Sequence, residues 1–280
     1  MLAELIIGDS YGTGFEGGGR ALTRTCNHAK TYVTQAHQKV LPGHYSARGQ
    51  GALVIAELMI GGQSWTRHLL ADELIKAFKR DRRSGFNESF ASLCGCAEDG
   101  KDFLKKMIPM KLDAEAAVRA CPLGILPRLA DIMDGSRHQA KLTHDMEESV
   151  AAAIAAAKMV HYALYDKGPI GEVDVFVGQF LPGVFQVPWD GVPTESAVHV
   201  LSAAMTAFGR NNSMMKLLRD CVDVGGPTGC TAAIALAAGS VSCRYKQDLP
   251  QTLFEKLERG EYGAEYIAGL DEQFMKIIPR

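Results

Sequence analysis

The sequence predicts an all-α fold, a compact helical bundle in a single domain over residues 1–280. Most of the chain falls in segments with the apolar spacing of amphipathic helices. Only residues 172–177 alternate apolar and polar side chains, and we expect a short strand or an extended loop there. Alanine, which lets helices approach closely, is concentrated in four segments. These segments are 114–120, 150–157, 203–207 and 232–238.

The clearest predicted helix covers about 145–164, where Asp145 and Glu148 match the spacing of a capping box and the interior is rich in alanine. Other helices are expected at 51–60, 66–81, 88–95, 121–134, 194–209 opening at Thr194, 213–223 opening at Asn211 or Asn212, 229–243, and 251–259 with Pro250 in its first turn. The proline-rich stretch 181–193 is predicted to be a long connection, because both of its flanks look equally core-forming.

Composition and charge narrow the class of function. The chain has 30 Lys+Arg and 32 Asp+Glu, a net charge of −2, so no overall positive field recruits nucleic acid or an anionic membrane. Its seven cysteines are an odd number and suggest no disulfide framework. No basic leader and no apolar run of about 18 residues is present. We therefore expect a cytoplasmic protein with neither a nucleic-acid partner nor a membrane partner.

The glycine-rich start, residues 8–12, fits two serine-hydrolase patterns in which Ser10 would be the nucleophile. Both patterns need a strand before the serine, a helix after it and a partner histidine, and the sequence predicts none of these around it. Zinc is disfavoured because the pairs Cys26/His28 and Cys94/Cys96 have the wrong spacing. The glycine loop 225–229 precedes a helix whose N-terminal amides favour an anion, but it lacks the lysine of a phosphate-binding loop.

Five segments occur in the order and spacing of one family. Residues 8–16 match an opening Gly-Asp, then Gly, then Glu, and 118–124 resemble Met-Arg-x-x-Pro-Leu-Gly. The others are 45–53, 143–145 and 223–235. The chain thereby resembles the ADP-ribosylglycohydrolases, all-α hydrolases that release ADP-ribose with the help of two magnesium ions. The resemblance implies the same helical fold.

The departures from that family fall on its metal ligands. Where the family has Thr-Asp-Asp, this chain has Ser46, Ala47 and Arg48, and where it has Asp-Thr-Asp-Thr, this chain has 227–230, Pro-Thr-Gly-Cys. All four carboxylates are missing, and magnesium requires hard oxygen ligands. We therefore predict no dinuclear metal site and no cofactor. The Asn-Gly pair that helps the family grip its ligand is also replaced, by the sequence Asp-Ala-Glu at 113–115.

The resemblance points to seven candidate site residues. Glu16 falls on the family's active-site glutamate and could act as acid or base at a glycosidic bond. Arg48 replaces charge lost with the metals and could clamp an anion. Candidate ligand-binding residues are Tyr45, Ser46, His144, Thr228 and Cys230. Trp65 and Trp189 are expected to be packing residues.

The leading hypothesis is a metal-independent protein that binds a small anionic molecule containing a nucleoside or ribose, such as a nucleotide or an ADP-ribose-like compound. Glu16 and Arg48 could then cleave or rearrange its glycosidic bond. The alternative is a catalytically silent pseudoenzyme kept for binding or regulation, in which Arg48 pairs with Glu16 and plugs the site. An esterase using Ser10 is the third and least favoured interpretation.

Overall fold

A computed structural model describes residues 1–34, 40–62, 66–109 and 112–278. The described chain is helical, as predicted, and an isolated β-bridge pairs Ser213 with Lys246. Trp65 lies outside these residues. The first helices along the chain are α1 (Leu2–Thr13), α2 (Gly19–Cys26), α3 (Ala47–Ile60), α4 (Arg67–Arg80), α5 (Glu88–Cys96), α6 (Gly100–Lys106) and α7 (Glu115–Ala120). They are followed by the 3₁₀ turn η1 (Cys121–Ile125), α8 (Leu129–Ala140), α9 (Glu147–Leu164), the turn η2 (Ile170–Glu172), α10 (Val173–Gly178), α11 (Ala197–Arg210), α12 (Met214–Asp223), α13 (Thr228–Val241), α14 (Gln251–Glu255) and α15 (Ala264–Lys276).

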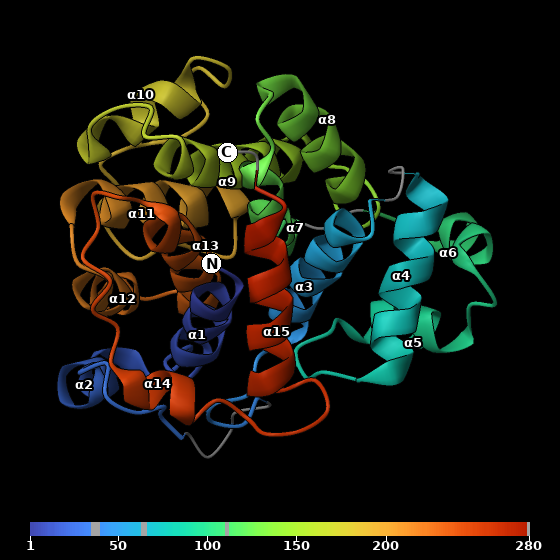
Figure 1. The fold of residues 1–280 in the computed structure, drawn as a ribbon, viewed down its shortest axis with the longest axis horizontal. Coiled ribbons are helices and arrows are strands. Elements are labelled where there is room, and N and C mark those ends of the chain that lie inside the picture. The colour runs from blue at the N-terminus through green and yellow to red at the C-terminus, as the bar shows by residue number, and fades with distance from the viewer. Residues whose placement is uncertain (35–39, 63–65, 110–111, 279–280) are drawn as a thin grey trace.

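The helices surround two hydrophobic clusters. The larger cluster is formed chiefly by α1, α9, α11, α12, α13 and α15, and the smaller one by α3 to α8 with one face of α9. In Figure 1, α4, α5 and α6 form a group at one end of the molecule, whereas α1 lies near its centre. None of the described helices has both the length and the apolar character that crossing a membrane requires.

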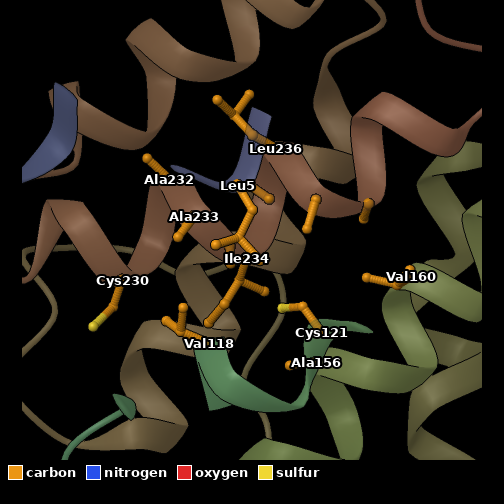
Figure 2. Packing of buried hydrophobic residues seen from close by; sticks show 14 of the residues in the cluster. Leu5, Val118, Cys121, Ala156, Val160, Cys230, Ala232, Ala233, Ile234 and Leu236 are labelled. Atoms are coloured by element: carbon orange, nitrogen blue, oxygen red, sulfur yellow. The ribbon is translucent and has the colours of Figure 1, made fainter. Parts of the chain in front are cut away.

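The alanine-rich helices lie at the centre, where they pack closely. Figure 2 shows Ile234 of α13 between Leu5 of α1 and Val118 of α7, with Cys121 beside them. All four side chains are fully buried. Small neighbours on α13, including Ala232 and Ala233, leave room for this contact and explain the concentration of alanine at 232–238.

Residues 172–177 are helical, so the predicted strand or extended loop is wrong. The valines at 173, 175 and 177 suggested alternation, but Val173 and Val177 are buried while Val175 is 58% exposed. Burial at i and i+4 is the helical pattern, and α10 follows it. The short apolar run fitted both periods, and tertiary packing selected the helix.

Several helix boundaries also differ from the prediction. Helix α9 begins after Met146 without a side-chain cap, and Asp145 instead pairs with Lys141, so the predicted capping box does not form. The predicted helix at 121–134 is broken into η1 and α8. Helix α11 begins at Ala197 rather than at Thr194, Ser213 is the cap of α12, and α14 ends at Glu255. Helices α1, α2, α6, α7 and α15 were not predicted.

Candidate functional site

The close packing of α1 against α13 positions the candidate site. A β-carbon at Gly8 would lie 2.6 Å from the carbonyl oxygen of Ala232, and one at Gly12 would overlap the carbonyl of Thr228. The two helices therefore touch backbone to backbone at both glycines, which no other residue allows without movement. This contact brings the end of α1, followed by Glu16, next to the beginning of α13.

The glycine pattern at 8–12 is thus a helix-packing feature and not a nucleophile elbow. Ser10 lies within α1 and is 4% exposed, and its hydroxyl has no hydrogen-bond partner in the part of the chain that the structure describes. A helix interior lacks the strand–turn–helix geometry that exposes such a serine. The structure therefore disfavours the esterase interpretation.

Arg48 lies at the centre of the site, in the first turn of α3. Ser46 caps this helix, and its hydroxyl also accepts a hydrogen bond from Nε of Arg48 at 3.1 Å. Nη1 donates to Glu16 Oε1 at 2.9 Å and to Cys230 Sγ at 3.3 Å. Nη2 donates to Thr13 Oγ1 at 2.9 Å and to Glu16 Oε2 at 3.3 Å. All five N–H donors of the guanidinium thus have a partner within the protein.

Asp9 adds a second carboxylate beside the guanidinium, and the sequence analysis did not identify it. Its Oδ1 lies 3.4 Å from Nε of Arg48, and it accepts hydrogen bonds from the amide (2.7 Å) and the hydroxyl (2.8 Å) of Ser46. Burial raises the pKa of Asp9, although Arg48 and Ser46 act against this. Burial alone would lower the pKa of Arg48, but Glu16, Cys230 and Asp9 outweigh it and hold that pKa well above its usual value. The positive charge predicted for the site is therefore matched by carboxylates within it.

Gly229 makes room for this network. A β-carbon at this position would lie 2.6 Å from Thr13 Oγ1, 2.9 Å from Glu16 Oε1 and 3.1 Å from Arg48 Nη2. The amide of Gly229 donates to Glu16 Oε1 at 3.0 Å. The N-terminus of α13 therefore does favour an anion, as the sequence suggested, and that anion is the protein's own Glu16.

A second group of polar residues surrounds His144, which is fully buried. Nη2 of Arg119 donates to Thr143 Oγ1 at 2.8 Å, and that hydroxyl lies 2.6 Å from His144 Nδ1. The carboxylate of Asp113 accepts hydrogen bonds, so Nε2 carries a ring proton and donates it to Asp113 Oδ1 at 2.7 Å. In the neutral ring, Nδ1 then accepts the proton of the Thr143 hydroxyl. Burial lowers the pKa of His144, which favours this neutral ring.

The two groups face a common small cavity of about 30 Å³. Its lining includes Arg48 from the first group, Arg119, Thr143 and Glu115 from the second, and the apolar Phe86 and Phe90. One donor atom each from Asp113, Glu115 and His144 lie within 4.8 Å of one another. The site therefore contains carboxylates, those of Asp113 and Glu115, although the four aspartates that hold metal in the family are missing.

The remaining predicted residues have structural contacts. The hydroxyl of Tyr45 donates to the carbonyl of Tyr262 at 3.0 Å, and its ring packs under Arg83. Thr228 donates to the carbonyl of Gly12 at 2.7 Å and so fastens α13 to α1. Burial raises the pKa of Cys230 to about 12, so it is a thiol that accepts from Arg48. The structure thus brings Glu16, Ser46, Arg48 and Cys230 together but gives Tyr45 and Thr228 packing roles.

The other residues considered from the sequence also have local contacts. The indole of Trp189 donates to the carbonyl of Gly191 at 3.1 Å, and its ring lies against His199. None of the seven cysteines forms a disulfide. Cys94 is buried whereas Cys96 is exposed, so their side chains do not share one environment.

Two of three comparisons with known proteins found a match, and these two agree on the fold. A model of the family described as ADP-ribosylglycohydrolase matches residues 1–278. A solved structure titled "ADP-ribosylglycohydrolase-related protein complex" is similar over 99% of this chain and 96% of the other, with a TM-score of 0.74 and 18% sequence identity. The comparison with curated proteins gave no match.

Proposed function

Because the chain belongs to the ADP-ribosylglycohydrolase family, we propose that it binds a small ribose-containing molecule without the magnesium pair that its resemblance to that family implied. In this proposal Arg48 takes the place of the metal ions, and Glu16 at its edge meets the ligand. The side chain of Glu16 is 29% exposed, whereas that of Asp9 is fully buried. Glu16 is therefore the carboxylate of the cluster that a ligand can reach.

The position of the Arg48 guanidinium carries this proposal. It joins the two segments that hold metal in the family, contacting Ser46 on one side and Cys230 on the other. The residues present do not fit a magnesium pair, because Gly229 has no side-chain oxygen and Cys230 is a protonated thiol. A cation already stands between the segments, and like charges close together repel.

Glu16 is held as a hydrogen-bond acceptor. Arg48 donates to both of its carboxylate oxygens, and the Gly229 amide donates to one of them. Charge-assisted bonds of this kind are stronger than bonds between neutral groups. A carboxylate held in this way can also accept a hydrogen bond from a ligand hydroxyl.

This arrangement favours binding over hydrolysis. An anionic ligand has to compete with Glu16 for Arg48, since all five N–H donors already have protein partners, whereas a neutral ribosyl group does not. Cleavage of a glycosidic bond remains the second candidate function. The partial exposure of Glu16 favours it, because a general base has to reach the reacting molecule.

Calorimetry with ADP-ribose, NAD and adenosine, with and without added Mg²⁺, tests the proposal. We expect at least one of these compounds to bind with an affinity that Mg²⁺ does not change and that Glu16→Gln weakens at least about tenfold. Glu147→Gln, at the exposed start of α9, is the matched control and should leave binding unchanged. Binding that depends on Mg²⁺, or that Glu16→Gln leaves intact, contradicts the proposal. A released product that disappears in Glu16→Gln would establish the cleavage function instead.

A further inference from the structure

We propose that Asp113, Glu115 and His144 bind one divalent transition-metal ion, at a place distinct from the Arg48 cluster. The three residues come from two segments. Asp113 precedes α7, Glu115 is the first residue of that helix, and His144 lies between α8 and α9. Their donor atoms lie within 4.8 Å of one another, although 31 residues separate Asp113 from His144 in the sequence.

The backbone holds the two segments against each other. The amide of Asp145 donates to the carbonyl of Pro109 at 3.0 Å, which ties the segment after α8 to the one before α7. The amide of Ala197 donates to the carbonyl of Leu112 at 2.9 Å and fixes the same segment from the side of α11. The residues on either side of Asp113 and His144 are therefore positioned before any ion binds.

The spacing of the donors suits a single ion. Ligands bonded to zinc or a similar ion at about 2.1 Å lie about 3–4 Å from each other. His144 Nε2 and Asp113 Oδ1 are 2.7 Å apart, and the third donor, from Glu115, is within 4.8 Å of both. Small side-chain rotations bring all three to bonding distance. Three protein ligands with further positions open are typical of catalytic rather than structural metal sites.

A buried histidine with an oriented ring is the independent observation that points to a metal. His144 is completely buried, and its Nε2 contacts the Asp113 carboxylate while Thr143 fixes Nδ1. Thr143 is in turn held by Arg119, whose Nε and Nη2 also donate to Gln139. Metal-binding histidines are commonly oriented in this way through the nitrogen that does not bind the metal. An Asp–His hydrogen bond alone would require only two residues, whereas here Glu115 places a third donor atom within 4.8 Å of the other two.

The ligand set selects the kind of ion. One imidazole and two carboxylates suit zinc, cobalt, manganese or iron better than magnesium or calcium, which prefer oxygen ligands alone. When the ion binds Nε2, the ring proton leaves that nitrogen and one proton binds Nδ1, where Thr143 Oγ1 accepts it. The neutral ring keeps one proton throughout, so binding at His144 releases none.

Titration of the full-length protein with Co²⁺ and Zn²⁺ tests this site. The variant Cys96→Ser/Cys243→Ser serves as the background, since these two thiols are exposed and could bind metal on their own. We expect one ion per chain, a Co²⁺ spectrum without the intense charge-transfer band of thiolate ligands, and no competition from Mg²⁺. Glu115→Gln and His144→Gln should each weaken binding at least about tenfold, and Thr143→Val should weaken it about 10- to 100-fold.

Asp145→Asn is the matched control, because Asp145 is adjacent to His144 but pairs with Lys141 on the surface. It should leave the affinity unchanged. The proposal is wrong if the background variant retains no ion, or if Glu115→Gln binds as tightly as its parent. Glu115 is only partly buried, so this variant keeps the test informative even if His144→Gln fails to fold. The measurement requires no nucleotide, so its failure leaves the proposed ribose-binding function untouched.

Discussion

Arg48 and Arg119 are both largely buried, and the protein holds them in opposite ways. Arg48, whose side chain is 14% exposed, is surrounded by the carboxylates of Asp9 and Glu16. Arg119, 6% exposed, donates to neutral oxygens of Gln139 and Thr143. The pKa of Arg48 is raised well above its usual value, whereas burial lowers that of Arg119 to about 10, despite the influence of Glu115 and Asp113.

The difference separates an arginine that balances charge from one that positions a neighbour. Arg48 offsets the negative charge of the Asp9 and Glu16 carboxylates, as a metal ion does. Arg119 orients Thr143 and through it the ring of His144. Lys158 on α9 resembles Arg119 in that it is a buried cation with neutral partners. It donates to the carbonyls of Phe176 and Val177 and lies over the ring of Phe180.

The largest effect should come from removing the charge of Arg48. Arg48→Met removes the guanidinium beside the fully buried Asp9, and breaking a buried pair in this way costs about 3–5 kcal/mol of the free energy of unfolding. Urea denaturation at pH 7 measures the change. Adding Asp9→Asn and Glu16→Gln should recover most of the loss, because neither side chain then carries a charge that Arg48 had offset.

The matched control for this prediction is Arg128→Met. Arg128 pairs with Asp131 on the surface, where an ion pair contributes little, so its free energy of unfolding should stay nearly unchanged. If Arg48→Met is as stable as Arg128→Met, the Arg48 cluster does not hold the site together, and the comparison with a metal ion fails.

Lys158 should give a smaller effect that depends on pH. Burial lowers its pKa to about 8, from an ordinary value of 10.5. Between pH 8 and 10.5 the unfolded chain binds more protons at this residue, so stability from this residue rises with pH across that window. The free energy of unfolding of the wild type, relative to Lys158→Met, should increase by at most about 3 kcal/mol from pH 8 to 10.5. A difference that is constant over this range contradicts the prediction.

The fold was more predictable from the sequence than the contacts within it. Apolar periodicity located α3, α4, α5, α9, α12 and α13 to within a few residues. It missed α1, since Gly8 and Gly12 weaken the helical signal, yet the contact with α13 requires those same glycines. It also misassigned α10, because six residues are too few to distinguish alternation from helical spacing.

Within the site, the motifs predicted that Glu16, Arg48 and Cys230 lie close together. They did not predict that Asp9 and Thr13 contact the same guanidinium. Asp9 and Thr13 are four residues apart, so they share a face of α1, and this spacing is a signal that could have been read. The approach of Glu115 to His144 could not have been predicted from spacing, because it depends on how α7 and α8 pack. Long-range packing of this kind leaves no local pattern in the sequence.

The smallest expected effect is that of Gly229→Ala, which tests whether the absence of a side chain at Gly229 is what makes room for Arg48. In Gly229→Ala the added carbon meets Thr13, Glu16 and Arg48 at 2.6–3.1 Å, so the variant should lose about 1–2 kcal/mol of the free energy of unfolding. Gly269→Ala is the control, since it lies in α15 with open space around it and should gain about 0.5–1 kcal/mol from helix propensity alone. In the Arg48→Met background, the Gly229→Ala loss should shrink, because Met removes the two hydrogen bonds by which Arg48 holds Glu16 close to the new carbon. An undiminished loss in that double variant, measured by urea denaturation, would show that Gly229 serves only the contact between α1 and α13, and that the two positions are not coupled.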